Sequence, residues 1–321
     1  GRKVAERMVE RGAKALVLLS RSGAASEDAK AFVRRIEDTG VKVVTPALDI
    51  TSGESSAFFK AMDEVLAGLP PVMGVVHAAG VLADAAFVNL TAEACEKVWC
   101  PKVTGAVRLA DYLMLRSIMP NFFVMFSSAT VLLGNPGQAN YVAANMALES
   151  LAGNLRAKGM PVHVIGWGPV GDVGMLLANP QAHRLLENTL GTPALASGDV
   201  LDAMETVIHV REPASHFFAI DWSRVQKLPV VREARFEGIW KRMGRHAVQA
   251  VSMAELLAGK SADEAILMLT DLIAQEVAKL MGISVKELNV HQPISDIGMD
   301  SLMVVELAVA LEERIGLKIP A

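Results

Sequence analysis

Short apolar segments alternate with amphipathic helical segments over most of the sequence, and this alternation constrains the fold more than any other feature. The predicted strands cover residues 16–19, 41–48, 72–76, 122–126, 162–165 and 217–220. Short, continuously apolar strands are typical of strands buried on both faces, and the helical segments between them are long enough to be crossovers. The sequence therefore predicts an α/β fold with a doubly wound, Rossmann-type parallel sheet.

One element of that fold is missing from the pattern. A dinucleotide-binding fold begins with a strand and a glycine-rich turn that leads into the first helix. Here the first predicted helix starts at once, so only Gly1 can belong to such a turn. The chain also lacks an initiator Met and ends abruptly at Ala321. We therefore expect an excerpt of a longer protein, with the first strand and most of the pyrophosphate cradle upstream of Gly1.

Composition limits the classes of function. A chain of 321 residues is long enough for more than one domain, and 52% hydrophobic with 21% charged residues is typical of a soluble globular protein. A net charge of −4 predicts no nucleic-acid partner, and no apolar run is long enough to predict a membrane span. Cys95 and Cys100 have neither metal-ligand spacing nor the pattern of a disulfide framework. We therefore expect no metal site and a reducing, cytoplasmic location.

The stretch from Phe126 to Asn145 contains the predicted reaction centre. A strand ends at Ser128, a Gly/Asn/Pro turn follows, and Tyr141 opens an Ala-rich helix with Asn145 one turn further along the same face. These groups would converge at the carboxyl edge of the sheet, where open α/β folds bind ligands. There the Tyr141 phenol would serve as general acid for carbonyl reduction, with Ser128 as a second donor to the oxygen. Lys102, on the preceding helix, would lower the pKa of the phenol.

Each of these residues also has a purely structural interpretation. Tyr141 taken alone is equally compatible with an amphipathic core position, and Lys102 with a solvated surface lysine. The joint spacing favours a reaction centre over these alternatives.

The order Lys102, Ser128, Tyr141 and Asn145 resembles the ketoreductase domain of modular type I polyketide synthases, a branch of the short-chain dehydrogenase/reductase family. In most of that family the residue four after the tyrosine is lysine, whereas in these ketoreductases Lys and Asn exchange places, as they do here. Segments L-L-S-R-S-G, H-A-A-G-V-L-A-D and G-W-G-P resemble the same domain. The resemblance covers about residues 1–225. It implies an NADPH-dependent β-ketoacyl reductase in which Tyr141 donates the proton, Ser128 orients the oxygen, and Lys102 and Asn145 tune Tyr141 and its proton relay.

The resemblance also implies contacts to the cofactor. Arg21 suits the 2′-phosphate of NADPH because a guanidinium pairs bidentately with phosphate, although a surface arginine at a strand end is the alternative. Asp49 and Ile50 would frame the adenine. The backbone at Gly80 would approach the nicotinamide ribose. The full predicted set is Gly1, Ser20, Arg21, Asp49, Ile50, Ala78, Ala79 and Gly80. His77 is expected to be a packed core histidine, and Trp167 and Met175 are expected to belong to a lid over the substrate.

Four further positions resemble the ketoreductases that produce D-configured 3-hydroxyl groups. The predicted stereocontrol residues are Leu82, Asp84, Pro136 and Asn140. Ala83 replaces the usual central Asp of the L-x-D loop, and the tryptophan of the opposite type is replaced by Leu133. Asp84 alone is equally compatible with an ordinary loop acid.

Beyond residue 225 the pattern changes. Residues 263–281 form a long amphipathic pattern, and D-S-L at 300–302 precedes a second helical pattern. This region resembles an acyl carrier protein with Ser301 as the attachment point of 4′-phosphopantetheine. An ordinary helix N-cap is the alternative role of that serine. We predict a truncated ketoreductase domain at 1–225, a linker at 226–262 and a truncated carrier domain at 263–321.

Together these features predict a ketoreductase–acyl carrier segment that reduces a β-ketoacyl thioester to the 3-hydroxyacyl thioester during polyketide chain extension. The implied partners are the acyl chain on the carrier domain, the ketosynthase and acyltransferase domains, and a phosphopantetheinyl transferase. Two alternatives stay open. One is a stand-alone short-chain dehydrogenase acting on a free small molecule, and the other is a carrier and scaffold segment with a silent reductase.

Overall fold

A computed structural model describes most of the chain up to residue 225 and parts of the remainder. The described residues are 1–174, 176–177, 187, 190–225, 233–242, 260–281, 283–290, 292–293, 297, 299, 303–304, 307–308 and 310–311. Ser301 and Met175 therefore lie outside the described residues.

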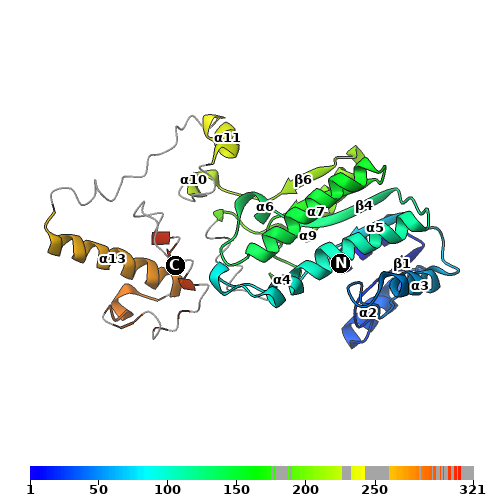
Figure 1. Cartoon of the computed structure of the whole chain (residues 1–321), viewed down its shortest axis with the longest axis horizontal. Helices are drawn as coiled ribbons and strands as arrows, with labels where there is room; N and C mark the ends of the chain where they lie inside the picture. The colour runs from blue at the N-terminus through cyan, green and yellow to red at the C-terminus, as the bar shows by residue number, and fades with distance from the viewer. Residues whose placement is uncertain are drawn as a thin grey trace.

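Parallel strands lie among helices in the right-hand part of Figure 1. The longest are β4 (Phe122–Ser128) and β5 (Val162–Trp167), and β5 is buried along its whole length. The others are β1 (Ala15–Val17), β2 (Lys42–Val44), β3 (Gly74–His77) and β6 (Ala214–Phe217). All neighbouring strands pair in parallel, and helices connect them, which confirms the predicted α/β class.

The strands form two sheets, β1–β2 and β3–β4–β5–β6. In a doubly wound sheet of order 3-2-1-4-5-6, the first strand lies between the second and the fourth. Strands β1 and β3 have the positions of the second and fourth strands of that order, and they do not pair with each other. The division into two sheets therefore falls between the positions of the second and fourth strands of that order.

Helices cover both faces of the sheets. They are α1 (Arg2–Glu10), α2 (Glu27–Glu37), α3 (Ser55–Leu66), α4 (Ala92–Trp99), α5 (Gly105–Leu115), α6 (Thr130–Leu133), α7 (Ala139–Ala157) and α9 (Ser197–Val210). Side chains alternate along β4, so that Phe123 and Met125 pack with α3, α5 and α7, whereas Val124 packs with α1 and α9. This three-layer arrangement places the carboxyl end of β4 beside the start of α7.

The sequence predicts one continuous helix over about 92–113, but the structure has a π-helical segment, η2 (Cys100–Thr104), between α4 and α5. Pro101 has no N–H group and its ring collides with the carbonyl of an α-helical preceding turn. A wider turn at this proline is the physical reason for the difference.

Two strands also differ from their predicted positions. Strand β2 ends at Val44, two residues before Pro46, because proline cannot donate to a strand ladder. Strand β6 covers Ala214–Phe217 rather than 217–220, since its pairing with β5 begins at Ala214. The start of β6 was not predicted because its residues Ser215 and His216 are polar and interrupt the apolar pattern.

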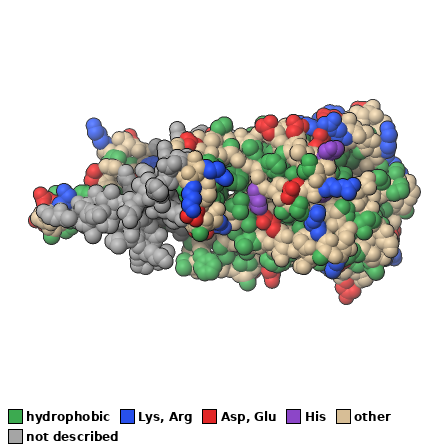
Figure 2. All heavy atoms as spheres, turned by 90° about the horizontal axis from the view of Figure 1, so that it is seen from above, with side chains coloured by type: hydrophobic (Ala, Val, Ile, Leu, Met, Phe, Trp, Pro, Cys, Tyr) green, Lys and Arg blue, Asp and Glu red, His purple; other side chains and the backbone are tan. Residues whose placement is uncertain are grey.

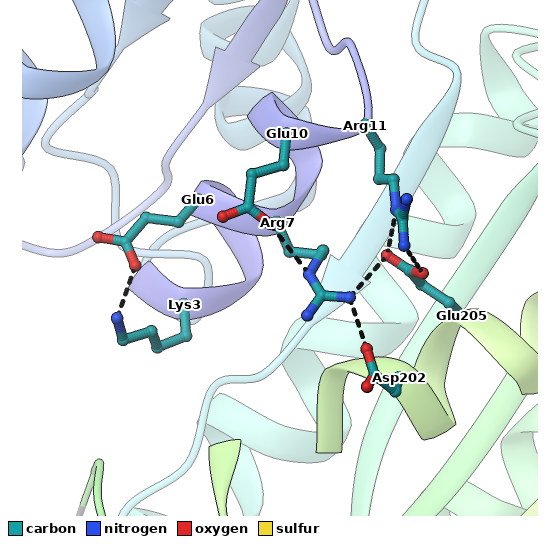
Figure 3. A network of polar contacts seen from close by, with 7 residues as sticks. All are labelled: Lys3, Glu6, Arg7, Glu10, Arg11, Asp202 and Glu205. Atoms are coloured by element: carbon teal, nitrogen blue, oxygen red, sulfur yellow. Dashed lines mark hydrogen bonds and ion pairs between the residues drawn. The ribbon is translucent and has the colours of Figure 1, made fainter. Parts of the chain in front are cut away.

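An ion-pair network fixes α1 on α9 (Figure 3). The Arg7 guanidinium lies 2.7 Å from Asp202 and 3.2 Å from Glu205. Arg11 donates two hydrogen bonds to the Glu205 carboxylate, at 2.8 and 2.6 Å. Positive and negative side chains are likewise interspersed over the face of the molecule seen in Figure 2.

Smaller hydrophobic clusters are formed mainly by residues that come after β6 in the chain. Helices α10 (Trp222–Val225) and α11 (Glu237–Arg242), with the 3₁₀ turn η4 (Ala234–Phe236), share a core of aromatic side chains that also packs against Leu133. Further on, α13 (Ala262–Met281) matches the predicted helix and precedes η5 (Val285–Glu287). Val277 of α13 packs with Met299, Leu307 and Leu311. None of the described helices is long and apolar enough to cross a membrane.

Candidate active site

The predicted reaction centre comes together at the carboxyl end of β4. Ser128 is the last residue of β4, Tyr141 and Asn145 lie in the first turns of α7, and Lys102 enters from η2. The Lys102 Nζ lies 5.1 Å from the centroid of the Tyr141 ring and donates to the Phe126 carbonyl at 3.0 Å. The Asn145 amide donates to the Tyr141 carbonyl at 2.8 Å.

Lys102 is only 3% exposed, which excludes a solvated surface lysine. Burial lowers its pKa to about 8, because a low-dielectric environment disfavours the ammonium ion. Lys102 is thus cationic at neutral pH and becomes neutral above about pH 8.

The expected lowering of the Tyr141 pKa is wrong. Burial of the phenol raises its pKa above the ordinary value, and hydrogen bonds from Asn145 and Ser128 oppose this only in part, while the charge of Asp84 adds to it. Desolvation of the phenolate therefore outweighs the stabilising contacts. Tyr141 stays protonated at neutral pH.

A buried histidine supports the position of Lys102. The His77 Nε2 lies 2.8 Å from the Lys102 carbonyl oxygen, at the π-helical turn. His77 is 4% exposed, and burial lowers its pKa to about 4, so the ring is neutral at physiological pH. His77 is the packed core residue predicted from the sequence, but its contact with η2 could not be predicted because it involves a backbone atom.

Gly80 lies directly against the lysine side chain. A Cβ at this position would approach the Lys102 Cε to 3.1 Å, which is tighter than nearly all such contacts. The close packing of the loop after β3 on Lys102 thus depends on the absence of a side chain at Gly80.

The predicted stereocontrol positions lie in the loop after β3 and in the turn that leads into the first turn of α7, and these two segments contact each other. Gln138 donates to the Asp84 carboxylate at 2.9 Å, and the Ala85 N–H donates to the Gly137 carbonyl at 2.9 Å. The buried Asn140 amide donates to the Ala83 carbonyl at 2.8 Å and accepts from the Tyr141 N–H at 2.8 Å. Leu82 and Pro136 are exposed. Gln138 joins the loops and was not predicted from the sequence.

The predicted cofactor residues lie at the carboxyl ends of β1, β2 and β3. Ser20 and Arg21 follow β1 and are exposed, and Ala78, Ala79 and Gly80 follow β3. The Asp49 carboxylate accepts from the Thr51 N–H at 2.8 Å and from its hydroxyl at 2.7 Å, which with the nearby charges of Arg21 and Arg108 lowers its pKa. Gly1 is the exception, because it is the N-cap of α1 and precedes β1 in the chain.

Arg108 holds the loop that contains Ile50. Its guanidinium donates to the carbonyls of Ile50 at 3.0 Å and Ser52 at 2.8 Å, and also to that of Gly53. Sequence reasoning missed this contact, because an arginine on a helix gives no signal of the loop it will reach.

Trp167 does not belong to a lid. It is the last residue of β5, 8% exposed, and its ring stacks on Phe217 at 5.6 Å and meets Phe126 edge-on at 5.5 Å. The apolar face of the sheet buries it, which corrects the expectation. Met175, the other expected lid residue, lies outside the described residues.

The site fits a polar ligand at the edge of the sheet. Asn145 is fully buried, and its Oδ1 has no hydrogen-bond partner within the described part of the chain. A buried acceptor of this kind needs a donor, which bound water or ligand would supply. The exposed Arg21 supplies a cation for phosphate at the same edge. These residues fit a phosphorylated dinucleotide.

Comparisons with known proteins agree with this geometry. The family model of the KR domain matches residues 1–172, and that of the phosphopantetheine attachment site matches residues 271–321. Polyketide synthase GfsA of Streptomyces halstedii is 34% identical over 100% of this chain and 4% of its own length. Erythronolide synthase EryA2 of Saccharopolyspora erythraea is 30% identical over 100% of the chain and 9% of its own length. The chain thus spans less than a tenth of these two relatives.

Solved structures of ketoreductases have the same fold. A structure of A-type ketoreductases from a modular polyketide synthase is 31% identical with a TM-score of 0.64, covering 70% of this chain and 46% of that one. The ketoreductase from the first module of phoslactomycin biosynthesis in Streptomyces sp. HK803 is 33% identical with a TM-score of 0.64, covering 71% and 52%.

Proposed function

Because the chain belongs to the KR domain family, the ketoreductases of polyketide synthases, we propose that it reduces the β-keto group of a carrier-bound acyl thioester to a hydroxyl with NADPH. The observation that carries this proposal is the buried Lys102 ammonium over the Tyr141 ring, beside the hydroxyl of Ser128. A buried cation is costly, and a silent reductase would gain nothing from keeping one at this position.

The chain's own groups complete the reduction. NADPH supplies the hydride when bound. The Tyr141 hydroxyl donates a proton to the substrate oxygen, and its raised pKa keeps that proton available. The Lys102 cation stabilises the phenolate that remains, and Asn145 contributes the buried Oδ1 to the path by which the proton is replaced.

Ser128 is oriented as a donor. Its Oγ accepts hydrogen bonds from the Thr130 N–H at 3.2 Å and from the Thr130 hydroxyl at 3.0 Å. A hydroxyl has two acceptor lone pairs and one proton, so both acceptor sites of Ser128 are used and its proton points toward the Tyr141 hydroxyl, where the substrate oxygen would bind.

For the cofactor, Arg21 would pair with the 2′-phosphate, Asp49 and Ile50 would border the adenine, and the backbone of Ala78 to Gly80 would border the ribose. Gly1 and Ser20 would contribute backbone or hydroxyl donors to the phosphates. The D configuration of the product is likewise a proposal, supported by the contacts that join the loop of Ala83 and Asp84 to Gln138 and to Asn140 at the start of α7.

The matched phosphopantetheine attachment site supports Ser301 as the residue that carries 4′-phosphopantetheine and the acyl chain. We keep the division into a ketoreductase domain (1–225), a linker (226–262) and a carrier domain (263–321) as part of the proposal. A phosphopantetheinyl transferase, ketosynthase and acyltransferase domains, and a cytoplasmic location complete it.

The proposal is tested by replacing Tyr141 with Phe in a synthase module that contains this chain. We expect NADPH oxidation on a β-ketoacyl diketide thioester to fall about 10²–10⁴-fold, the usual contribution of a general acid. Loading of Ser301 by a phosphopantetheinyl transferase should be unchanged. Retained oxidation in Tyr141→Phe would contradict the role of the phenol, and a wild-type module that loads Ser301 but reduces nothing would favour the silent-reductase alternative.

A further inference from the structure

Three neighbouring strands present a row of residues beneath α7. In the register of the sheet, Ser127 of β4 pairs with Gly166 of β5, which in turn pairs with His216 of β6. A Cβ at Gly166 would lie 2.1 Å from the His216 ring, so the ring occupies the space that a side chain on β5 would need. The absence of a side chain at Gly166 therefore lets the His216 ring extend over the middle strand, β5.

Glu149 of α7 bridges this row. Its Oε1 accepts a hydrogen bond from the Ser127 hydroxyl at 2.7 Å and lies 3.1 Å from the His216 Nε2. Ser127 is 4% exposed, and the side chains of His216 and Glu149 are 18% and 22% exposed. One carboxylate oxygen thus joins α7 to both β4 and β6.

The bridge shares a helix face with the reaction centre. Tyr141, Asn145 and Glu149 follow each other at intervals of four residues, one turn apart on α7. At the other end of the bridge, Ser127 directly precedes Ser128 on β4. The Glu149 contact therefore sets the position of the helix that carries the phenol against the strand that carries the hydroxyl.

Apolar packing also holds this helix against the sheet. Leu148, Ala152 and Leu155 of α7 are nearly or fully buried against the core of the sheet. Removing a carboxylate from water is unfavourable unless hydrogen bonds replace the lost solvation. The polar contacts of Glu149 restrict the orientation of the helix, because hydrogen bonds require a defined geometry that apolar contacts do not.

We propose that Glu149 is a positioning residue for the reduction, which holds Tyr141 in register with Ser128 and Lys102 through Ser127 and His216. The inference rests on the proposed function for its kinetic consequence. Glu149 does not contact the reacting atoms itself.

The test compares variants of Glu149 in a synthase module that contains this chain. In Glu149→Ala we expect kcat for a diketide thioester to fall by about tenfold or more, because small displacements of catalytic groups are costly, while the KM values change by less than about twofold. Glu149→Gln should retain kcat within about threefold, because its amide oxygen accepts the same hydrogen bonds. Ser150→Ala, at the exposed neighbouring position of the same helix, is the control and should equal the wild type.

Hydrogen–deuterium exchange of the Tyr141–Asn145 amides supplies a readout that does not depend on activity. Exchange should be faster in Glu149→Ala than in Glu149→Gln or Ser150→Ala. If Glu149→Ala does not fold, Ser127→Ala removes only one donor and should still lower kcat and speed this exchange.

A wild-type kcat in Glu149→Ala, or equal losses in the Ala and Gln variants, would overturn the inference. So would unchanged exchange at Tyr141–Asn145. A wild-type module without reduction would contradict the proposed function instead, and the exchange comparison would still decide the role of Glu149.

Discussion

Lys102 and Tyr141 meet in a part of the site from which water is largely excluded. Burial moves the pKa of the lysine down to about 8 and that of the tyrosine up. The two shifts are complementary, because the phenol keeps the proton it must donate while the ammonium stays charged at neutral pH. Proton transfer to the substrate oxygen then leaves a phenolate next to a cation in a medium of low dielectric constant.

The lysine predicts a pH dependence of the reduction. Lys102 loses its proton as the pH rises through about 8, so the rate of reduction should fall above that pH with a single inflection. Lys102→Met should have a lower rate at pH 7 and should lack the inflection, because methionine fills similar space without a charge. The rate of NADPH oxidation at saturating thioester, measured from about pH 6 to about pH 9, checks both expectations. An unchanged inflection in Lys102→Met would assign it to another group.

Residue types and spacing were sufficient to predict which side chains would meet. Ser128, Tyr141 and Asn145 lie close because the carboxyl end of a strand and the helix that follows it are adjacent in a βα unit. Lys102 reaches them from η2, which precedes β4. The direction of the Tyr141 pKa shift could not be predicted, because it depends on how completely other elements cover the ring. The contacts of His77 and Arg108 could not be predicted either, because their partners are backbone carbonyls.

At the scale of elements, two local breaks in regular structure serve the site. Pro101 prevents a continuous α-helix, and the π-helical turn that results carries Lys102. Gly166 removes a side chain from the middle of β5, and the His216 ring fills the space. Proline and glycine are visible in the sequence, but what fills the space around them depends on strands and helices distant along the chain.

The packing at Gly166 predicts an effect on stability. Gly166→Ala should lower the free energy of unfolding by about 1–3 kcal/mol, because the new methyl group overlaps the His216 ring. In a His216→Ala background the same substitution should cost clearly less. Gly153→Ala, at a helical position with no atom within 4 Å of the new Cβ, should instead be neutral or stabilising. Urea denaturation of the four variants and the wild type measures these differences, and equal costs in both backgrounds would contradict the packing described.

Strand positions were predicted well where the apolar run is continuous and less well where polar residues interrupt it. Strands β4 and β5 are buried and apolar, and the sequence placed both within a few residues. Strand β6 was displaced by three residues because Ser215 and His216 interrupt its apolar pattern. The polar side chain of His216 is explained by its contact with Glu149, which is not visible from the sequence.

At the scale of the whole molecule, the described strands form two sheets that share one helix. Val4 of α1 packs on the core of the four-stranded sheet, while Ala5 packs with β1, β2 and α2. Arg7 and Arg11 then fix the same helix on α9. Helix α1 thus connects the half of the fold that carries Arg21 and Asp49 with the half that carries Tyr141. The sequence predicted a doubly wound parallel sheet, but not the contacts by which α1 joins its halves.

The central claim is that Tyr141 donates the proton when NADPH reduces an acyl chain attached to Ser301. Intact-protein mass spectrometry of the carrier-bound chain tests this claim most directly. A synthase module containing this chain is loaded with a β-ketoacyl group on Ser301 and incubated with NADPH. The wild type should gain the mass of two hydrogens on the acylated carrier, whereas Tyr141→Phe, loaded to the same extent, should keep the mass of the β-ketoacyl form. An equal gain of mass in both proteins, or none in either, would contradict the account.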